Sequence, residues 1–149
     1  MQLLSRRSML GIAAVVDIAH HARPTPVAAK ALAGRHALPP RHLETLLQAL
    51  VRHGILKGVR GPRGGYELAR ERRRITAGDI VRAAMTAAVM EDEPAPSSRL
   101  VDQVVAPAVG RASEAFLAEL DEVTVEDLCR DAEGKLFFGG TPAGIDFAI

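Results

Sequence analysis

Apolar residues recur at helical spacing along much of the chain, beginning near the N-terminus. One such stripe predicts a buried helix and consists of Met9, Ile12, Ala13, Val16 and Ala19. Asp17 and His21 lie together off this stripe. A cleaved twin-arginine export signal, or an uncleaved membrane anchor, also begins with two arginines and an apolar run. The helix is favoured because the apolar run is short and Asp17 interrupts it.

A second helix is predicted over about residues 27–35, with Thr25 as its N-cap and Pro26 at its first position. The residues expected to face inward are Val27, Ala28, Ala31 and Leu32. A short turn at His36–Leu38 follows, and the next helix begins at Pro40. The sequence therefore predicts two helices joined by a tight turn.

The third helix, from Pro40 to about His53, has the clearest amphipathic pattern in the chain, and Gly54 ends it. Its apolar stripe consists of Leu43, Leu46, Leu47, Leu50 and Val51. Its polar face carries Arg41, His42, Glu44, Thr45, Gln48 and Arg52. A helix pair of this kind is typical of a helix-turn-helix, although an ordinary helical hairpin fits these two helices equally well.

The residues after the third helix predict a β-hairpin. Ile55–Val59 and Tyr66–Leu68 have the character of short strands, and the sequence RGPRGG lies between them. Arg60 and Arg63 occupy its tip, where glycines permit a close approach of the backbone to a phosphate. Beside the helix pair, such a hairpin is typical of a DNA-binding wing, with a hairpin carrying solvated arginines as the alternative.

The next segment holds the basic run of residues 70–74, interpreted as a solvated loop with phosphate contact as a second possibility. Thr76 and Asp79 suggest a capping box before a helix that extends to about Val89. The residues of this helix expected to be buried are Ile80, Val81 and Ala84.

The C-terminal half is predicted to contain an acidic linker and a long helix. The linker covers residues 90–98, and the helix covers residues 99–120 with a kink at Pro107. Its stripe is expected to pack on a partner chain through Val101, Val105, Ala108, Ala112 and Phe116. Packing back on its own domain is the alternative. Thr124 and Asp127 suggest another capped helix.

Composition adds limits to this picture. The chain has 149 residues, 48% of them apolar, and a formal net charge of +1. Most of the Lys and Arg residues precede position 75, so the basic character is local. The single cysteine, Cys129, permits neither an internal disulfide nor an all-cysteine metal site within one chain. No apolar stretch is long enough to span a membrane, and we expect a cytoplasmic protein.

Several segments match the pattern of one known family. They are AVVDIA in the first helix, LPPRHLETLLQALVRHGIL through the third, and VRGPRGGYELA and ITAGDIV through the hairpin and beyond. The chain resembles the Rrf2-type winged helix-turn-helix transcriptional regulators over about residues 1–88, and more loosely over 99–131, where VTVEDL matches a family element.

The resemblance implies a homodimer that binds double-stranded DNA at an imperfect palindrome, with residues 40–48 at the major groove and the hairpin at the minor groove. Short polar side chains at the N-terminal end of a helix suit base reading, and an arginine suits a narrow minor groove. The candidate DNA-binding residues are Arg6, Arg7, Arg41, His42, Glu44, Thr45, Gln48, Lys57, Arg60, Gly61, Pro62, Arg63, Gly64 and Gly65.

The chain departs from the family pattern in its cysteines. Many family members bind an iron–sulfur cluster through three cysteines before the long helix, and residues 87–100 contain none, so no cofactor is predicted. A structural role is favoured for His36 over ligation, and a buried thiol is favoured for Cys129 over thiol sensing. Pro39 replaces the usual Ser or Thr before the third helix, which removes a side-chain cap.

These observations predict a mainly α fold with a small β-wing, in which a winged helix-turn-helix DNA-binding domain is joined to a long dimerisation helix. The expected units are residues 1–89, a linker over 90–98, a helical part over 99–132 and an unassigned tail over 133–149. The predicted function is a sequence-specific regulator, a repressor, with an unknown effector. The alternative is a protein-interaction or small-molecule sensor module without an operator. An enzyme is not predicted, because no nucleophile–base pair or metal-ligand pattern stands out.

Overall fold

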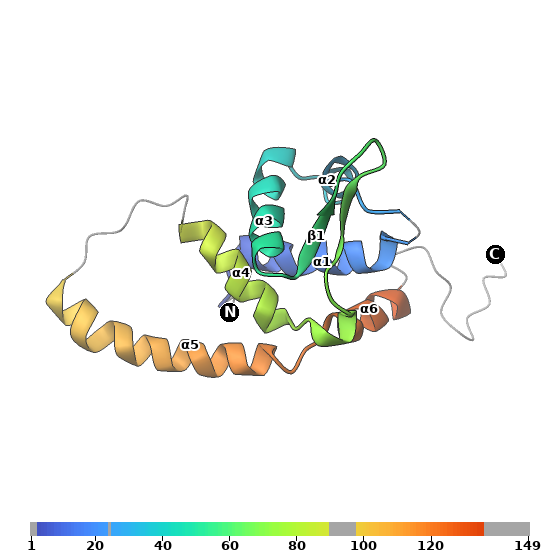
Figure 1. Ribbon diagram of the computed structural model, residues 1–149. Coiled ribbons are helices and arrows are strands. Elements are labelled where there is room, and N and C mark those ends of the chain that lie inside the picture. Colours follow the sequence, from blue (N-terminus) through green and yellow to red (C-terminus); the bar gives the residue numbers. More distant parts are fainter. Residues whose placement is uncertain (1–2, 24, 90–97, 136–149) are drawn as a thin grey trace.

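The computed structural model describes residues 3–23, 25–89 and 98–135 (Figure 1). The acidic linker, apart from Ser98, and the tail beyond Lys135 lie outside the described residues. The elements follow in the order α1 (Arg6–His21), α2 (Ala29–Arg35), α3 (Pro40–Arg52), β1 (Leu56–Val59), β2 (Gly65–Leu68), η1 (Arg72–Arg74), α4 (Ala77–Val89), η2 (Val101–Val105), α5 (Ala106–Leu120) and α6 (Val125–Gly134).

Helix α1 lies at the centre of the domain and buries a different face from the one predicted. Its buried residues are Ser8, Gly11, Ala14, Val15, Asp17 and Ile18. The predicted stripe is half-buried, and Met9 is exposed. Small residues explain why this face of α1 is the buried one, since a Cβ at Gly11 would lie 3.4 Å from Ile80 Cγ2 and 3.5 Å from Leu46 Cδ1. The small face therefore lets α3 and α4 approach α1 closely.

Helix α2 begins later than predicted, and Thr25 does not cap it. The N-cap is Ala28, without a side-chain hydrogen bond. Val27 instead pairs with Tyr66 of β2 through two backbone hydrogen bonds of 2.9 and 2.8 Å. This bridge draws residue 27 into the sheet, so Val27 and Leu32 are buried as predicted, whereas Ala28 and Ala31 are exposed.

Helix α3 agrees with its prediction and contributes four leucines to the core. Leu43, Leu46, Leu47 and Leu50 are all buried, and Val51 is half-buried. The turn before it contains Ala37, which has a positive φ of 51°. Leu38 N–H donates to the Ala33 carbonyl at 2.9 Å, which closes the end of α2. This turn fixes where the exposed start of α3 points.

The two strands form an antiparallel hairpin with Leu56 opposite Leu68 and Val59 opposite Gly65. The glycines at its tip are required by contacts within the protein. A Cβ at Gly64 would collide with the Val59 carbonyl oxygen, and one at Gly65 with the Val27 backbone. The glycines were expected to let a phosphate approach the backbone closely. In this structure, they let other backbone atoms of the same chain approach instead.

Both predicted capping boxes are confirmed. Asp79 N–H donates to Thr76 Oγ1 at 3.0 Å, and Thr76 N–H donates to Asp79 Oδ2 at 3.1 Å. Thr124 and Asp127 make the same reciprocal pair at the start of α6. The buried positions predicted in α4, which include Ile80, are also confirmed.

The long helix differs from its prediction at its first turns. Residues Val101–Val105 form a π-helical stretch, and the α-helix begins at Ala106, one residue before Pro107. Proline lacks the N–H that a regular helix would use there, and the wider turn accommodates this loss. The end of α5 is tied to α4, because Arg82 donates to both Asp121 carboxylate oxygens at 2.7 and 2.8 Å.

Candidate nucleic-acid interface

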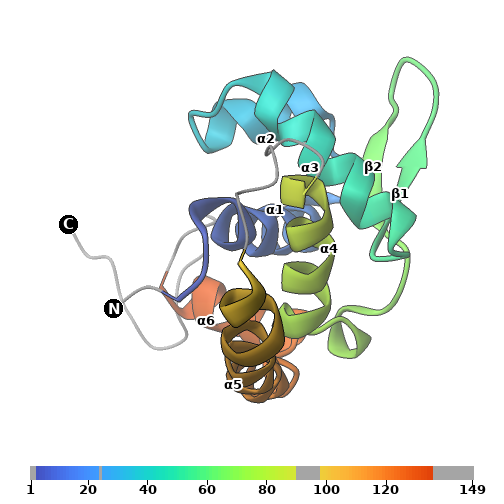
Figure 2. The same ribbon diagram turned by 90° about the vertical axis from the view of Figure 1, so that its left-hand side faces the viewer.

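The N-terminal end of α3 and the loop of the β-hairpin project from the same side of the molecule (Figure 1). Helix α5 lies on the opposite side, and the view in Figure 2 agrees with this separation. The helix-turn-helix and the hairpin therefore form one continuous end of the domain. This arrangement is the one that a winged helix requires to contact two neighbouring grooves.

The predicted reading residues lie together on the outer face of α3. Arg41, His42, Glu44 and Gln48 are exposed, and Thr45 is half-buried. Arg41 makes no ion pair with any described residue, so its guanidinium is available to a ligand. The apolar stripe fixes the rotation of the helix, and the polar face consequently points outward.

Arg6 and Arg7 lie beside the start of α3. Together with Leu38, Pro39 and His42, they line a shallow cavity of about 280 Å³ between α1 and α3. Ser5 caps α1 through a 3.1 Å hydrogen bond from Ser8 N–H, which holds the two arginines in the first helical turn. Arg6 is exposed and thus extends the basic surface, whereas Arg7 is half-buried.

The hairpin presents two arginines that are free of ion pairs among the described residues. Arg60 and Arg63 are exposed at its tip, next to Gly61 and Pro62. Lys57 differs, since its Nζ lies 3.1 Å from Glu67 Oε1 on the neighbouring strand. Arg60 and Arg63 are therefore the stronger candidates for phosphate contact, and Lys57 the weaker.

The basic run at residues 70–74 is largely engaged within the protein. The run was predicted as a solvated loop: Arg70, Arg73 and Arg74 are exposed, but Arg72–Arg74 form the short helix η1. Arg72 Nε lies 2.6 Å from Glu126 of α6, and Arg73 Nε lies 2.7 Å from Glu71. Arg70 donates to the Gly54 carbonyl at 3.2 Å. This run secures α6 to the domain, and only Arg74 is exposed without a described ion pair.

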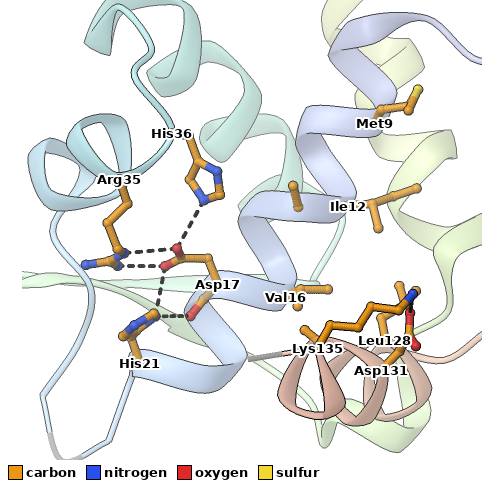
Figure 3. Close-up of a pocket in the computed structure, with 12 residues that line it drawn as sticks. Met9, Ile12, Val16, Asp17, His21, Arg35, His36, Leu128, Asp131 and Lys135 are labelled. Carbon is orange, nitrogen blue, oxygen red and sulfur yellow. Dashed lines mark hydrogen bonds and ion pairs between the residues drawn. The ribbon is translucent and has the colours of Figure 1, made fainter. Parts of the chain in front are cut away.

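A charged cluster surrounds the buried carboxylate of Asp17, and the sequence did not predict it (Figure 3). Asp17 of α1 accepts hydrogen bonds from Arg35 Nε at 2.9 Å and Nη2 at 2.6 Å, and its Oδ2 lies 3.0 Å from His36 Nε2. His21 Nδ1 lies 3.2 Å from Oδ1. The cluster joins α1 to the last residue of α2 and to the turn that leads into α3.

The charges in this cluster decide the ionisation of Asp17. Burial alone would raise the pKa of its carboxyl group, but the hydrogen bonds and charge of Arg35, with His21 and His36, lower the pKa below its ordinary value. Asp17 is therefore ionised at neutral pH. The signal in the sequence was the lone carboxylate inside an apolar run, since a buried charge needs a partner.

The predicted partner-facing stripe of the long helix is uncovered in the single chain. Val101, Val105, Ala108 and Ala112 are exposed, and Phe116 is half-buried. Further large apolar residues are exposed next to them at Leu100, Val104 and Val109. Contiguous exposed apolar surface of this kind marks a contact site in a soluble protein.

The residues that the structure describes do not fit a metal centre. Cys129 is 1% exposed, and burial raises the pKa of its thiol, which favours the protonated form that binds metals poorly. Among the described residues, no group of three or more His, Cys, Asp and Glu side chains could hold a metal ion. His36 was the other candidate ligand, and its Nε2 lies 3.0 Å from Asp17 Oδ2.

A family model described as "Rrf2: Iron-dependent Transcriptional regulator" matches residues 4–131. Protein rrf2 of Nitratidesulfovibrio vulgaris is 35% identical over 132 residues, which cover 87% of this chain and 88% of that protein. The chain belongs to the Rrf2 family. It is thus a DNA-binding transcriptional regulator, and the prediction that it is not an enzyme agrees with the relatives named as regulators.

Solved structures of Rrf2 family members confirm the winged-helix fold class. The structure of T. potens IscR aligns with a TM-score of 0.67 at 32% identity and covers 90% of each chain. The structure of CymR from B. subtilis aligns with a TM-score of 0.64 at 27% identity, covering 88% of this chain and 98% of CymR. The described part of this Rrf2 protein contains no helix that could cross a membrane.

Proposed function

We propose that this Rrf2 protein is a cytoplasmic repressor that binds an imperfect palindrome in double-stranded DNA as a homodimer. The observation that carries the proposal is that the N-terminal end of α3 and the hairpin loop project from the same side of the domain (Figure 1). Each copy would place α3 in a major groove and the hairpin at the adjacent minor groove.

Within this proposal, Arg41 and Thr45 have the central reading role. They lie one helical turn apart on the same face of α3, so both reach into the groove together. Arg41 would donate to a guanine, and Glu44 would accept from cytosine N4. His42 and Gln48 flank them, and Arg6 and Arg7 would contact the backbone beside the same groove.

The homodimer is supported by the exposed apolar stripe of the long helix. An exposed row of valines and alanines is costly in water, and a second copy would bury it. We expect Val105→Glu to give a monomer in sedimentation equilibrium, whereas Gln103→Glu, an exposed change outside the stripe, leaves the dimer intact. A dimeric Val105→Glu protein would remove the stripe from the interface.

The test of the DNA-binding proposal is selection of bound fragments from the native genome by the purified full chain, followed by mobility-shift titration of the enriched fragments. We expect enrichment of sites that share a two-fold related motif, with binding that weakens steeply as salt rises. Random enrichment would instead favour the alternative, an interaction or sensor module without an operator. Iron analysis of the same preparation tests the prediction that no cluster is bound.

A further inference from the structure

An open groove of about 870 Å³ lies between α1, the end of α2 and α6 (Figure 3). Much of its floor is the α1 stripe that the core leaves half-buried. The apolar residues that line it are Met9, Ile12, Ala13, Val16, Leu128 and Ala132. Small-molecule sites have this size and combine an apolar lining with a few polar groups.

The polar end of the groove is formed by the Asp17 cluster. The Asp17 side chain is only 3% exposed, whereas Arg35, His21 and His36 are 37%, 31% and 30% exposed. The anion of the cluster is thus hidden, and its nitrogen-bearing partners face the groove and solvent. A ligand at this end meets the guanidinium of Arg35, while the carboxylate of Asp17 lies below the surface.

The hydrogen-bond donors left at this end belong to Arg35. Both oxygens of Asp17 already accept bonds, so they offer little to a ligand. Arg35 uses Nε and Nη2 for Asp17, and its Nη1 donates to no acceptor among the described residues. At the other rim Lys135 and Asp131 pair with each other at 3.0 Å and balance in charge.

We propose that this groove binds a small carboxylic acid with an apolar body. Arg35 holds the carboxylate, because a charge-assisted hydrogen bond from a guanidinium suits that group. The apolar body lies along α1 and α6, against Val16 and Leu128. The site is separate from the DNA-binding face and does not depend on the proposed function.

The position of the site gives binding a consequence that does rest on the proposed function. Arg35 is the last residue of α2, and His36 begins the turn to α3. A carboxylate bound at Nη1 shares the Arg35 guanidinium with Asp17, and this changes the restraint on the helix-turn-helix. Because linkage is reciprocal, ligand and DNA then alter each other's affinity by the same factor.

The test uses the full chain without DNA, with hexanoate as the probe and hexanamide and hexylamine as matched controls. We expect saturable binding of hexanoate in calorimetry, shifts of the Val16 and Leu128 methyl signals in NMR spectra, and binding of hexanamide that is at least about tenfold weaker. Equal binding of hexylamine would overturn the carboxylate specificity. Absence of saturable binding, as when a second copy covers the groove, would overturn the site.

Variants locate the two ends of the site. The double variant Asp17→Asn with Arg35→Gln keeps a neutral hydrogen-bonded pair and removes the cation, and Ala132→Phe fills the apolar end. Both are expected to weaken hexanoate binding at least about tenfold, whereas Arg130→Gln, an exposed cation of α6 outside the groove, leaves it unchanged. Unchanged binding in both groove variants would overturn the proposal.

A final experiment tests whether ligand binding in the groove changes the affinity for DNA. Operator fragments from the genomic selection are titrated with and without saturating hexanoate. A changed operator affinity supports the coupling. An unchanged operator affinity beside saturable hexanoate binding would overturn the coupling while the site stands.

Discussion

Arg35 and Asp17 form a bidentate ion pair between the end of α2 and the middle of α1, with N–O distances of 2.9 and 2.6 Å. The carboxylate is buried, and the guanidinium remains partly exposed. The pair ties the helix-turn-helix to the central helix of the domain through two directional hydrogen bonds.

Removal of the buried carboxylate is expected to destabilise the domain. Asp17→Ala leaves Arg35 and His36 without their acceptor, at a cost of about 1–3 kcal/mol in the free energy of unfolding, limited because both partners can turn toward water. Urea denaturation measures this loss. Asp131→Ala, which removes an exposed pair with Lys135, should change stability by less than about 0.5 kcal/mol. Equal losses in the two variants would contradict a special role for Asp17.

The same cluster predicts acid sensitivity. The pKa of Asp17 lies below its ordinary value of 3.8, so the ionised carboxylate stabilises the folded state at pH values above 3.8. This stabilisation is lost as the pH falls through the lower pKa of the folded protein. Unfolding free energies measured at about pH 5 and about pH 2, on either side of the ordinary pKa of 3.8, should decline less for Asp17→Asn than for the wild type. Parallel declines would assign the acid sensitivity to other groups.

Gly65→Ala tests the packing of the hairpin against the strand-like residue before α2. The new Cβ would meet the Val27 backbone, so the Val27–Tyr66 bridge must open or shift. We expect a loss of about 1–3 kcal/mol in thermal unfolding. Gly58→Ala is the matched control in the same hairpin, because nothing lies within 4 Å of a Cβ at that position. Similar melting temperatures for the two variants would show that the bridge contributes little.

Arg60→Ala tests the role of the hairpin in DNA binding. The side chain is exposed and has no described ion pair, so its loss should not affect folding. We expect operator binding to weaken by roughly 1–3 kcal/mol in a mobility-shift titration. Arg130→Ala removes an exposed arginine from α6, on another part of the domain, and should leave affinity unchanged. Unchanged affinity in Arg60→Ala would remove the hairpin tip from the mechanism.

Local signals in the sequence predicted the elements whose structure is decided locally. Both capping boxes, the amphipathic helix at Pro40–Arg52 and the hairpin follow from residues that lie close together in the chain. The polar face of α3 and the hairpin tip could be identified in the same way. These segments also carried the family resemblance that the comparisons confirm.

Contacts between distant residues explain what the sequence did not predict. The first helix is apolar or small on most of its surface, and only its packing against α3 and α4 decides which face is buried. Asp17 is buried because Arg35, 18 residues later, pairs with it. Thr25 does not cap α2, because Val27 pairs with Tyr66 next to the sheet. Each outcome depends on a partner that periodicity cannot identify.

Hydroxyl-radical footprinting on a genome-selected operator measures most directly whether this Rrf2 protein binds DNA as proposed. Two copies that each place α3 in a major groove should protect two related segments, with centres about 10 base pairs apart or a multiple of that spacing, and Arg41→Ala should abolish the protection. A single protected segment, or a footprint that Arg41→Ala leaves unchanged, would contradict binding by paired recognition helices.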